Sequence, residues 1–206
     1  MYRPRVFNVD DLPTLHEFIV RRAFGTVAAV VSGTIHLAYA PVVLDATAGE
    51  RGSVRFHLAH SNPVTKIDGA RVRLSFLGPD AYVSPDWYET PAMVPTWNYV
   101  AVEGEGIARQ MDKPTLRQLL VDLSAAQEEK LLLKKPWTIG KVPEERIAAM
   151  MNIIEGFTVE FETLEGKFKL SQDKIPEDFE GVATALEARS DAASAAVATA
   201  MRKARG

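Results

Sequence analysis

The chain has 206 residues, of which 47% are apolar and 25% charged, and it contains no cysteine. These values indicate a folded chain with a sizeable core and exclude disorder, disulfide scaffolds and cysteine-based metal sites. Its 24 basic and 27 acidic side chains give a formal charge of -3, which argues against broad binding to nucleic-acid phosphates. No apolar run is long enough for a membrane span and no signal peptide is evident, so we expect a cytoplasmic protein.

The first half of the chain predicts one helix followed by strands. Asp10 or Asp11 caps the helix, and Pro13 lies in its first turn. Alternating apolar residues then predict strands, with turns at Ser32-Gly33 and at Gly78-Pro79-Asp80. These strands cover residues 25–31, 35–44, 54–59, 71–76, 81–84 and 97–111. Gly104 and Gly106 predict that the last strand is bent or bulged.

The second half predicts two helices, a hairpin and a final helix. Asp112 caps a helix with leucines at helical spacing, and Pro143 opens another that ends near Ile154, closed by Gly156. A strand over 157–164 turns at Glu165-Gly166 and returns over 167–171. An alanine-rich helix follows from Glu177.

Consecutive strands with short links indicate an antiparallel sheet. The fold class we expect is mainly β (α+β), an antiparallel barrel with flanking helices. Its domain covers residues 1–188, and residues 189–206 form a helical extension.

No standard catalytic motif is present. The sequence lacks a phosphate-binding glycine loop and a serine nucleophile elbow. His57 and His60 are three positions apart with no carboxylate spaced to complete a ligand set, so we expect no metal site. The basic KLLLKK run at 130–135 is interpreted as the solvated end of a helix.

Two segments could bind a ligand. In HLAHSNPVTK, a strand stops at the Asn62-Pro63 turn and Lys66 follows. The turn's N–H groups and this lysine could hold an anion, although a plain turn with a solvated lysine is the simpler interpretation. The second segment, SPDWYETPAMVPTWNYVAV, carries aromatic side chains that suit a planar ligand or a subunit interface, or that simply cap the barrel mouth.

Six motifs give the chain a family resemblance from Met1 to about Leu186. They are MYRPRVF at the start, PVVLD from Pro41, HLAHSNP with Lys66, SPDWYE from Ser84, VPTWNYVAV from Val94 and GKFKLSQ from Gly166. With these motifs the chain resembles the FMN-binding negative transcriptional regulator (PaiB-like) family. More distantly it is similar to the FMN-binding split β-barrel of the pyridoxamine-phosphate-oxidase type.

The resemblance implies a homodimer with FMN in a groove at the subunit interface. It assigns Lys66, Asn62 and His60 to the flavin phosphate, and Thr26, Pro41 and Val42 to the flavin ring system. From the later strand it assigns Trp97 and Asn98. The residues that would close the site from the C-terminal side are Lys167, Lys169, Ser171 and Gln172.

The chain departs from the family pattern at three positions. His60 stands where an arginine is expected, Thr65 where a tryptophan is expected, and Tyr39 where a histidine is usual. Arg71 or Arg73 is a candidate for the missing positive charge.

The resemblance implies an FMN-binding protein with a regulatory or redox role. The sequence shows no helix-turn-helix with a basic recognition helix, so direct DNA binding is not expected. Two alternatives stay open. One is a flavin-dependent oxidoreductase or haem-utilisation relative, because the flavin itself would carry the electron chemistry. The other is a cofactor-free dimeric regulatory binding module.

Overall fold

A computed structural model describes residues 1–131 and 133–205. Leu132, inside the KLLLKK run, and Gly206, the last residue of the predicted extension, lie outside the described residues. The chain forms two compact units. The closed-sheet unit contains Leu12–Phe76 and Glu103–Leu164, and the terminal unit contains Met1–Asp11, Leu77–Val102 and Glu165–Gly206.

Six strands form a closed circuit, and two of them extend into the terminal unit at residues 77–83 and 96–102. The hydrogen-bonded order is β6-β5-β2-β3-β4-β7, and an additional pairing of β6 with β7 completes the circuit. The strands are β2 (Phe24–Val31), β3 (Thr34–Asp45), β4 (Ser53–Ala59), β5 (Arg71–Val83), β6 (Thr96–Gln110) and β7 (Ile154–Glu160). The pairs β2–β3, β2–β5, β3–β4, β4–β7 and β6–β7 are antiparallel. The predicted antiparallel fold is therefore confirmed.

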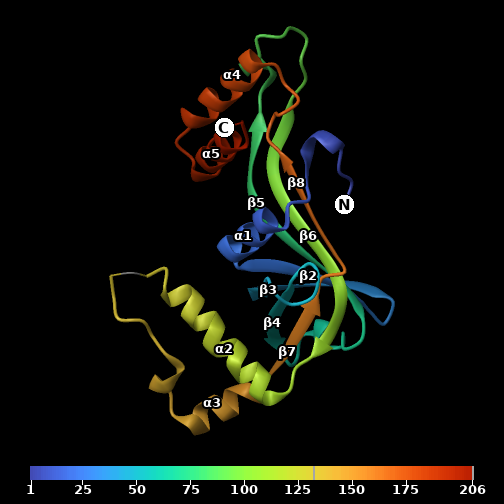
Figure 1. The fold of residues 1–206 in the computed structure, drawn as a ribbon, viewed down its shortest axis with the longest axis vertical. Helices are drawn as coiled ribbons and strands as arrows, with labels where there is room; N and C mark the ends of the chain where they lie inside the picture. The colour runs from blue at the N-terminus through green and yellow to red at the C-terminus, as the bar shows by residue number, and fades with distance from the viewer. Residues whose placement is uncertain (132, 206) are drawn as a thin grey trace. The chain divides into compact units, whose positions relative to one another are not determined.

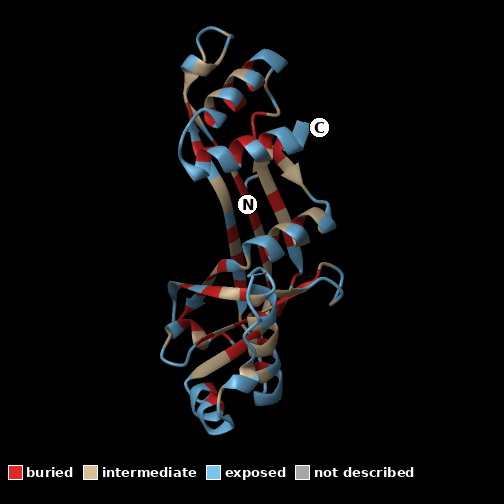
Figure 2. Ribbon diagram, turned by 90° about the vertical axis from the view of Figure 1, so that its left-hand side faces the viewer, coloured by how far each residue is buried: buried red, intermediate tan, exposed pale blue. Residues whose placement is uncertain are grey.

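Alternation along these strands places one set of side chains in the core. Val27, Phe56, Leu74 and Phe157 are completely buried, while their neighbours in sequence face outward. In Figure 2 buried and exposed segments accordingly alternate along the strands.

Three helices belong to the closed-sheet unit: α1 (Leu12–Arg22), α2 (Lys113–Glu128) and α3 (Glu144–Met151). The predicted cap of α2 is confirmed, because the Asp112 carboxylate accepts the Thr115 N–H at 2.9 Å. Leucines of α2 pack against α3, and the two helices lie side by side (Figure 1). On the other side, α2 contacts β3 and β4. This arrangement covers the outer face of the sheet where Val43 of β3 packs against the leucines of α2.

The terminal unit contains a strand pair and two helices. β1 (Asn8–Val9) pairs with β8 (Thr163–Lys169), and α4 (Pro176–Glu187) lies beside α5 (Ala192–Arg205) (Figure 1). We predicted one helix here, which is wrong. The Asp191 carboxylate caps a separate α5 by accepting the Ser194 N–H at 2.9 Å. Short 3-10 turns occur at Arg5–Phe7, Pro63–Thr65, Pro85–Trp87 and Ile139–Lys141. Within the described residues, no helix is both long and apolar enough to cross a membrane.

Two predicted element ends are wrong. Gly78-Pro79-Asp80 is not a turn, because β5 runs without a break from Arg71 to Val83. The pairing of β5 with β2 ends at Ser75, so no β2 carbonyl needs the N–H that Pro79 lacks. Helix α3 ends at Met151 and Gly156 lies inside β7, where a Cβ would come within 2.9 Å of Leu116.

The predicted hairpin between residues 157–164 and 167–171 is also wrong. β7 pairs with β4 and β6, whereas β8 pairs with β1 and neighbours β6. The chain leaves β7 at Phe161, whose N–H donates to the Gly52 carbonyl at 3.0 Å, and the Glu162 N–H donates to the Glu105 carbonyl at 2.8 Å. These two hydrogen bonds hold residues 161–162 against Gly52 and Glu105, so the chain does not fold back on β7 in a hairpin.

Of the two predicted alternatives, β6 is bent rather than bulged (Figure 1), and Gly104 and Gly106 permit close packing on it. β6 is continuous from Thr96 to Gln110, and neither glycine has a positive φ. A Cβ on Gly104 would overlap the Phe161 ring, and one on Gly106 would overlap the Glu160 carbonyl. The two glycines therefore let residues 160–161 lie directly on β6.

Replacing Gly106 by Ala should lower the free energy of unfolding by about 1–3 kcal/mol, because the new methyl group meets backbone that cannot move freely. Urea unfolding of the purified variant measures this change. Gly140→Ala is the matched control, since only Thr138 Oγ1, at 4.0 Å, lies near its Cβ position. Equal stability of the two variants would contradict the close approach.

Candidate functional site

A short 3-10 turn follows β4 and presents Lys66. The Asn62 side-chain oxygen accepts the Val64 N–H at 2.9 Å, the Thr65 N–H donates to the Asn62 carbonyl and the Lys66 N–H to the Pro63 carbonyl. The Asn62 N–H donates to the Ala59 carbonyl. These four N–H groups already have acceptors within the turn, so the anion-binding role stays a prediction that would have to rest on side chains.

The Lys66 side chain is exposed, and no acidic side chain of residues 1–131 and 133–205 pairs with it. The loop that follows is tied to the end of β6. The Gly69 N–H donates to the Ala108 carbonyl, the Ala108 N–H donates to the Ala70 carbonyl, and the Gln110 N–H donates to the Asp68 carboxylate, all at 2.9 Å. These three hydrogen bonds hold the loop after Lys66 against the end of β6.

Arg109 is a second basic residue at this loop. Its Nη1 lies 3.7 Å from the Cβ position of Gly69, its side chain is exposed, and it has no acidic partner in the described part of the chain. Arg71 and Arg73, the candidates from the sequence, pair instead with Glu162 at 2.6 Å and with Glu103 at 3.3 Å. Sequence spacing gave no signal for Arg109, because its position depends on hydrogen bonds between the loop and β6.

His60 makes a different contact from its predicted one. Its Nδ1 lies 2.7 Å from Oε1 of Glu155. The other carboxylate oxygen of Glu155 accepts a hydrogen bond from the Gln110 amide. The hydrogen bond with His60 is the main cause that keeps the pKa of Glu155 below its ordinary value. A phosphate at His60 would also meet this carboxylate, so the structure adds no support for His60, whose role stays a prediction.

Thr26 and Pro41 lie on one outward surface of the β2–β3 hairpin. Thr26 pairs with Tyr39 and with Ser75, and Pro41 pairs with Phe24. Exposed apolar side chains surround them on this surface, which we call the hairpin face: Phe24, Val30, Ile35, Leu37 and Tyr39, each 44–73% exposed. Val42 points the other way and is 4% exposed, so its side chain belongs to the core.

The remaining predicted residues belong to the terminal unit, where the motifs VPTWNYVAV and GKFKLSQ contact each other. Asn98 is 0% exposed and donates to the Ser171 hydroxyl at 2.9 Å, and its amide also lies 3.5 Å from the Met201 sulfur. Ser171 is 3% exposed and has a φ of 61°. A cofactor could reach neither polar group without opening this buried contact.

Contacts on either side extend this connection between the motifs. Lys169 donates to the Thr96 hydroxyl, and burial lowers the pKa of this lysine. Lys167 donates to the Tyr2 carbonyl at 3.2 Å and lies 5.4 Å from the centre of the Tyr99 ring. These contacts give VPTWNYVAV and GKFKLSQ a shared structural role.

Gln172 and Trp97 differ in how far they are available to a ligand. The Gln172 amide bonds at both ends to the backbone, accepting from Leu170 and donating to Phe168. The Trp97 side chain is half exposed and meets Tyr82 edge to face, with ring centres 6.2 Å apart. Of the terminal-unit residues proposed for cofactor binding, Trp97 is the one that offers an open apolar surface.

The predicted residues therefore fall into two groups. Those assigned to the phosphate and flavin ring system belong to the closed-sheet unit, and the others belong to the terminal unit. Within the described residues, no cluster of three or more histidine and acidic side chains could hold a metal ion.

The sequence matches one protein family and a bacterial relative over most of its length. Residues 1–163 match the family described as "Putative FMN-binding domain". The "Protease synthase and sporulation protein PAI 2" of Bacillus subtilis (strain 168) is 28% identical over 189 residues, which cover 91% of this chain and 89% of that protein. An uncharacterised protein of Aspergillus fumigatus is 28% identical over 237 residues, covering 91% of each.

Solved structures share the fold at low sequence identity. The FAD and heme binding protein of Mycobacterium smegmatis has a TM-score of 0.57 at 13% identity, covering 83% of this chain and 78% of its own. The flavocytochrome Anf3 of Azotobacter vinelandii has a TM-score of 0.56 at 13% identity, covering 87% and 77% respectively. At such identities the likeness concerns the fold alone.

Replacing Asn98 by Ala should lower the free energy of unfolding by about 1–3 kcal/mol, because the Ser171 hydroxyl loses its partner in the core. Urea unfolding measures the loss. Asn152→Ala, at an exposed position after α3, should change stability by less than about 0.5 kcal/mol. Unchanged stability of Asn98→Ala together with a lost affinity for FMN would make Asn98 a cofactor ligand instead.

Proposed function

The chain belongs to the "Putative FMN-binding domain" family, and from this premise we propose that it binds FMN as a homodimer, with the flavin at the subunit interface. When bound, the flavin supplies the electron-transfer chemistry. The protein's own contribution is to hold the phosphate at one end and the flat ring system at the other. The observation that carries the proposal is that two basic side chains have no acidic partner among the described residues: Lys66 at the turn after β4, and Arg109 beside Gly69 of the loop that follows.

Lys66 and Arg109 suit the phosphate end. The FMN phosphate carries close to two negative charges, and a guanidinium and an ammonium bind such a group by charge-assisted hydrogen bonds. Both side chains are exposed, and no described carboxylate neutralises either of them. The Asn62 amide nitrogen is a further donor, since only its oxygen is used within the turn. This set fits a phosphate without the turn's N–H groups.

The hairpin face suits the flavin ring system. Thr26 and Pro41 lie on it, beside the Tyr39 and Leu37 side chains. A flat apolar ring needs such a surface together with a few hydrogen-bonding groups, and Thr26 and Tyr39 supply hydroxyls there.

The hairpin face also supports the homodimer. Ile35 is 73% exposed, Tyr39 65% and Val30 60%. Several large apolar side chains gathered on one strand pair mark an interaction surface more often than free surface. A second copy of the chain would bury them, and the flavin would then lie at the interface because Thr26 and Pro41 share this face.

For the cellular role we propose negative regulation, as the family resemblance implies, in the cytoplasm, where the sequence led us to expect the protein. The relative in Bacillus subtilis is named for protease synthesis and sporulation. The formal charge of -3 argues against broad binding to DNA phosphates. The regulatory effect is therefore proposed to pass through another protein or a small molecule.

Lys66→Gln should weaken FMN binding about ten- to a hundredfold, because a charge-assisted contact to the phosphate is lost. Riboflavin, which lacks the phosphate, should bind the variant and the wild type equally. Fluorescence titration of each flavin measures both affinities. Lys135→Gln, at an exposed lysine far along the chain, is the matched control. Undiminished FMN affinity in Lys66→Gln would show that the phosphate lies elsewhere.

Leu37→Glu should convert the proposed dimer into a monomer, because it places a charge in the apolar interface. Light scattering after size-exclusion chromatography gives the mass of each species. Val20→Glu is the matched control, since Val20 is equally exposed but lies on α1. A wild-type protein that runs as a monomer with FMN bound would contradict the interface.

A further inference from the structure

The segment that follows α2 is rich in lysine. Residues 130–141 contain four lysines and no acidic residue, and they include the KLLLKK run. We call the described part of this segment, residues 130–131 and 133–141, the lysine loop. It belongs to the closed-sheet unit and begins just beyond α2, which ends at Glu128. The proposed flavin site uses none of its residues.

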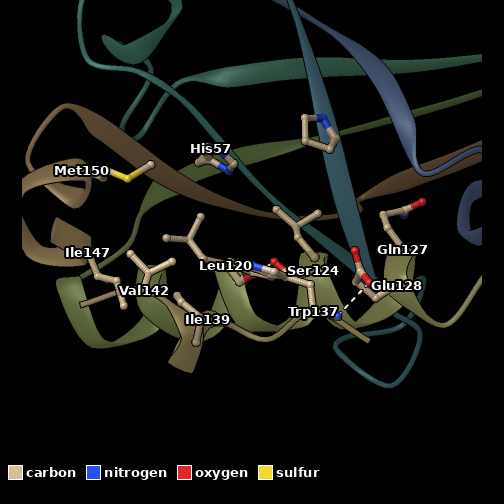
Figure 3. A pocket seen from close by; sticks show the side chains of 12 residues that line it. His57, Leu120, Ser124, Gln127, Glu128, Trp137, Ile139, Val142, Ile147 and Met150 are labelled. Carbon is tan, nitrogen blue, oxygen red and sulfur yellow. Dashed lines mark hydrogen bonds between the residues drawn. The ribbon is translucent and has the colours of Figure 1, made fainter. Parts of the chain in front are cut away.

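Glu128 holds the lysine loop in a compact form. Its carboxylate accepts the Trp137 N–H at 2.8 Å, which Figure 3 marks with a dashed line, and it pairs with Lys134. The Leu131 N–H donates to the Glu128 carbonyl at 3.0 Å, and the Lys134 N–H donates to the Leu131 carbonyl at 3.3 Å. Further along, Ile139 packs against the buried side chains of α2 and α3. These contacts attach both ends of the loop to the folded unit.

Large apolar side chains of the lysine loop are exposed to solvent. Leu133 is fully exposed, Leu131 is 51% exposed and Trp137 is 36% exposed. Three such side chains thus occur within seven consecutive positions. Leucine at full exposure contributes nothing to the core, and apolar side chains that gather on the surface mark an interaction site more often than free surface.

The same loop carries an excess of positive charge. All four lysines are exposed: Lys130, Lys134, Lys135 and Lys141. In the part of the chain that the structure describes, Lys134 is the one of these four that forms an ion pair. Acidic residues flank the loop at 128–129 and 144–145. Two of them are neutralised within the protein, Glu128 by Lys134 and Glu144 by Arg117. The loop therefore combines free positive charge with exposed apolar side chains.

We propose that the lysine loop binds a membrane surface that contains anionic lipid. Leu131, Leu133 and Trp137 enter the boundary between headgroups and acyl chains, while the lysines stay at the level of the anionic headgroups. Tryptophan favours this boundary because its ring is apolar and its N–H is polar. Each lysine close to such a surface strengthens binding about fivefold. The attachment is reversible, because no segment of the loop spans the bilayer.

The apolar side chains favour a membrane over a nucleic acid. Phosphates of a nucleic acid would bind the lysines but would leave Leu131 and Leu133 in water. An anionic membrane satisfies both groups, because it offers negative headgroups directly above an apolar layer. Lysine and exposed leucine in one short segment are the combination that this surface requires.

The test is sedimentation of the purified protein with large vesicles, either of phosphatidylcholine alone or with about 30% phosphatidylglycerol added. The wild type should bind the anionic vesicles at least about tenfold more tightly, and high salt should remove most of this difference by screening the lysines. Leu133→Glu should weaken binding to anionic vesicles at least about tenfold, because it replaces an inserted side chain by a negative charge. Lys135→Gln should weaken it about fivefold.

Val20→Glu and Arg21→Gln are the matched controls. They make the corresponding changes at exposed positions of α1 and should leave vesicle binding unchanged. A wild-type protein that does not bind anionic vesicles, or binds both kinds equally, would overturn the proposal. Binding that Leu133→Glu leaves intact would also overturn it. If the wild type then retains duplex DNA and Lys135→Gln does not, the lysine loop is a site for nucleic-acid phosphates instead.

Discussion

The close approach of residues 160–161 to β6 is the constraint on which the closed sheet depends. Only residues without a side chain at 104 and 106 leave room for the Phe161 ring and the Glu160 carbonyl. That approach lets β7 pair with β6 over residues 108–110 and so closes the circuit of strands. The same end of β6 holds the loop after Lys66, through Ala108 and Gln110. Residues 108–110 of β6 therefore both close the sheet and position the loop beside the proposed phosphate contacts.

The basic side chains differ in whether neighbouring groups of the protein already bind them. Those with such partners have a structural role, and those without are the candidates for binding the phosphate. Arg71 and Arg73 lie on the closed sheet and pair with acidic side chains there. In the terminal unit, Lys167 and Lys169 donate to oxygen atoms of neighbouring residues. Lys66 and Arg109 have no such partner among the described residues, and both are exposed. An anion can bind these two side chains without breaking an ion pair within the protein, so no such cost reduces its affinity.

The sequence predicted most elements of the fold because their signals are local. Alternating apolar residues located the strands, and Asp112 located the start of α2. The failures depend on distant partners. Pro79 continues a strand because β2 has ended beside it, and Glu165-Gly166 does not turn because β8 pairs with other strands. For the site, the turn with Lys66 was found from its residues, whereas Arg109 and the buried Asn98–Ser171 pair required the folded chain. The motifs VPTWNYVAV and GKFKLSQ contact each other, and sequence alone could not distinguish such contacts from contacts to a cofactor.

The most direct measurement of the central claim is the visible absorption spectrum of the purified protein after incubation with FMN and desalting. The account predicts a retained flavin spectrum with about one flavin for each subunit, because the uncompensated basic pair and the hairpin face together hold the cofactor. A colourless protein after desalting would contradict it. Lys66 and Arg109 would then be solvated surface residues, and the hairpin face would serve protein contacts alone.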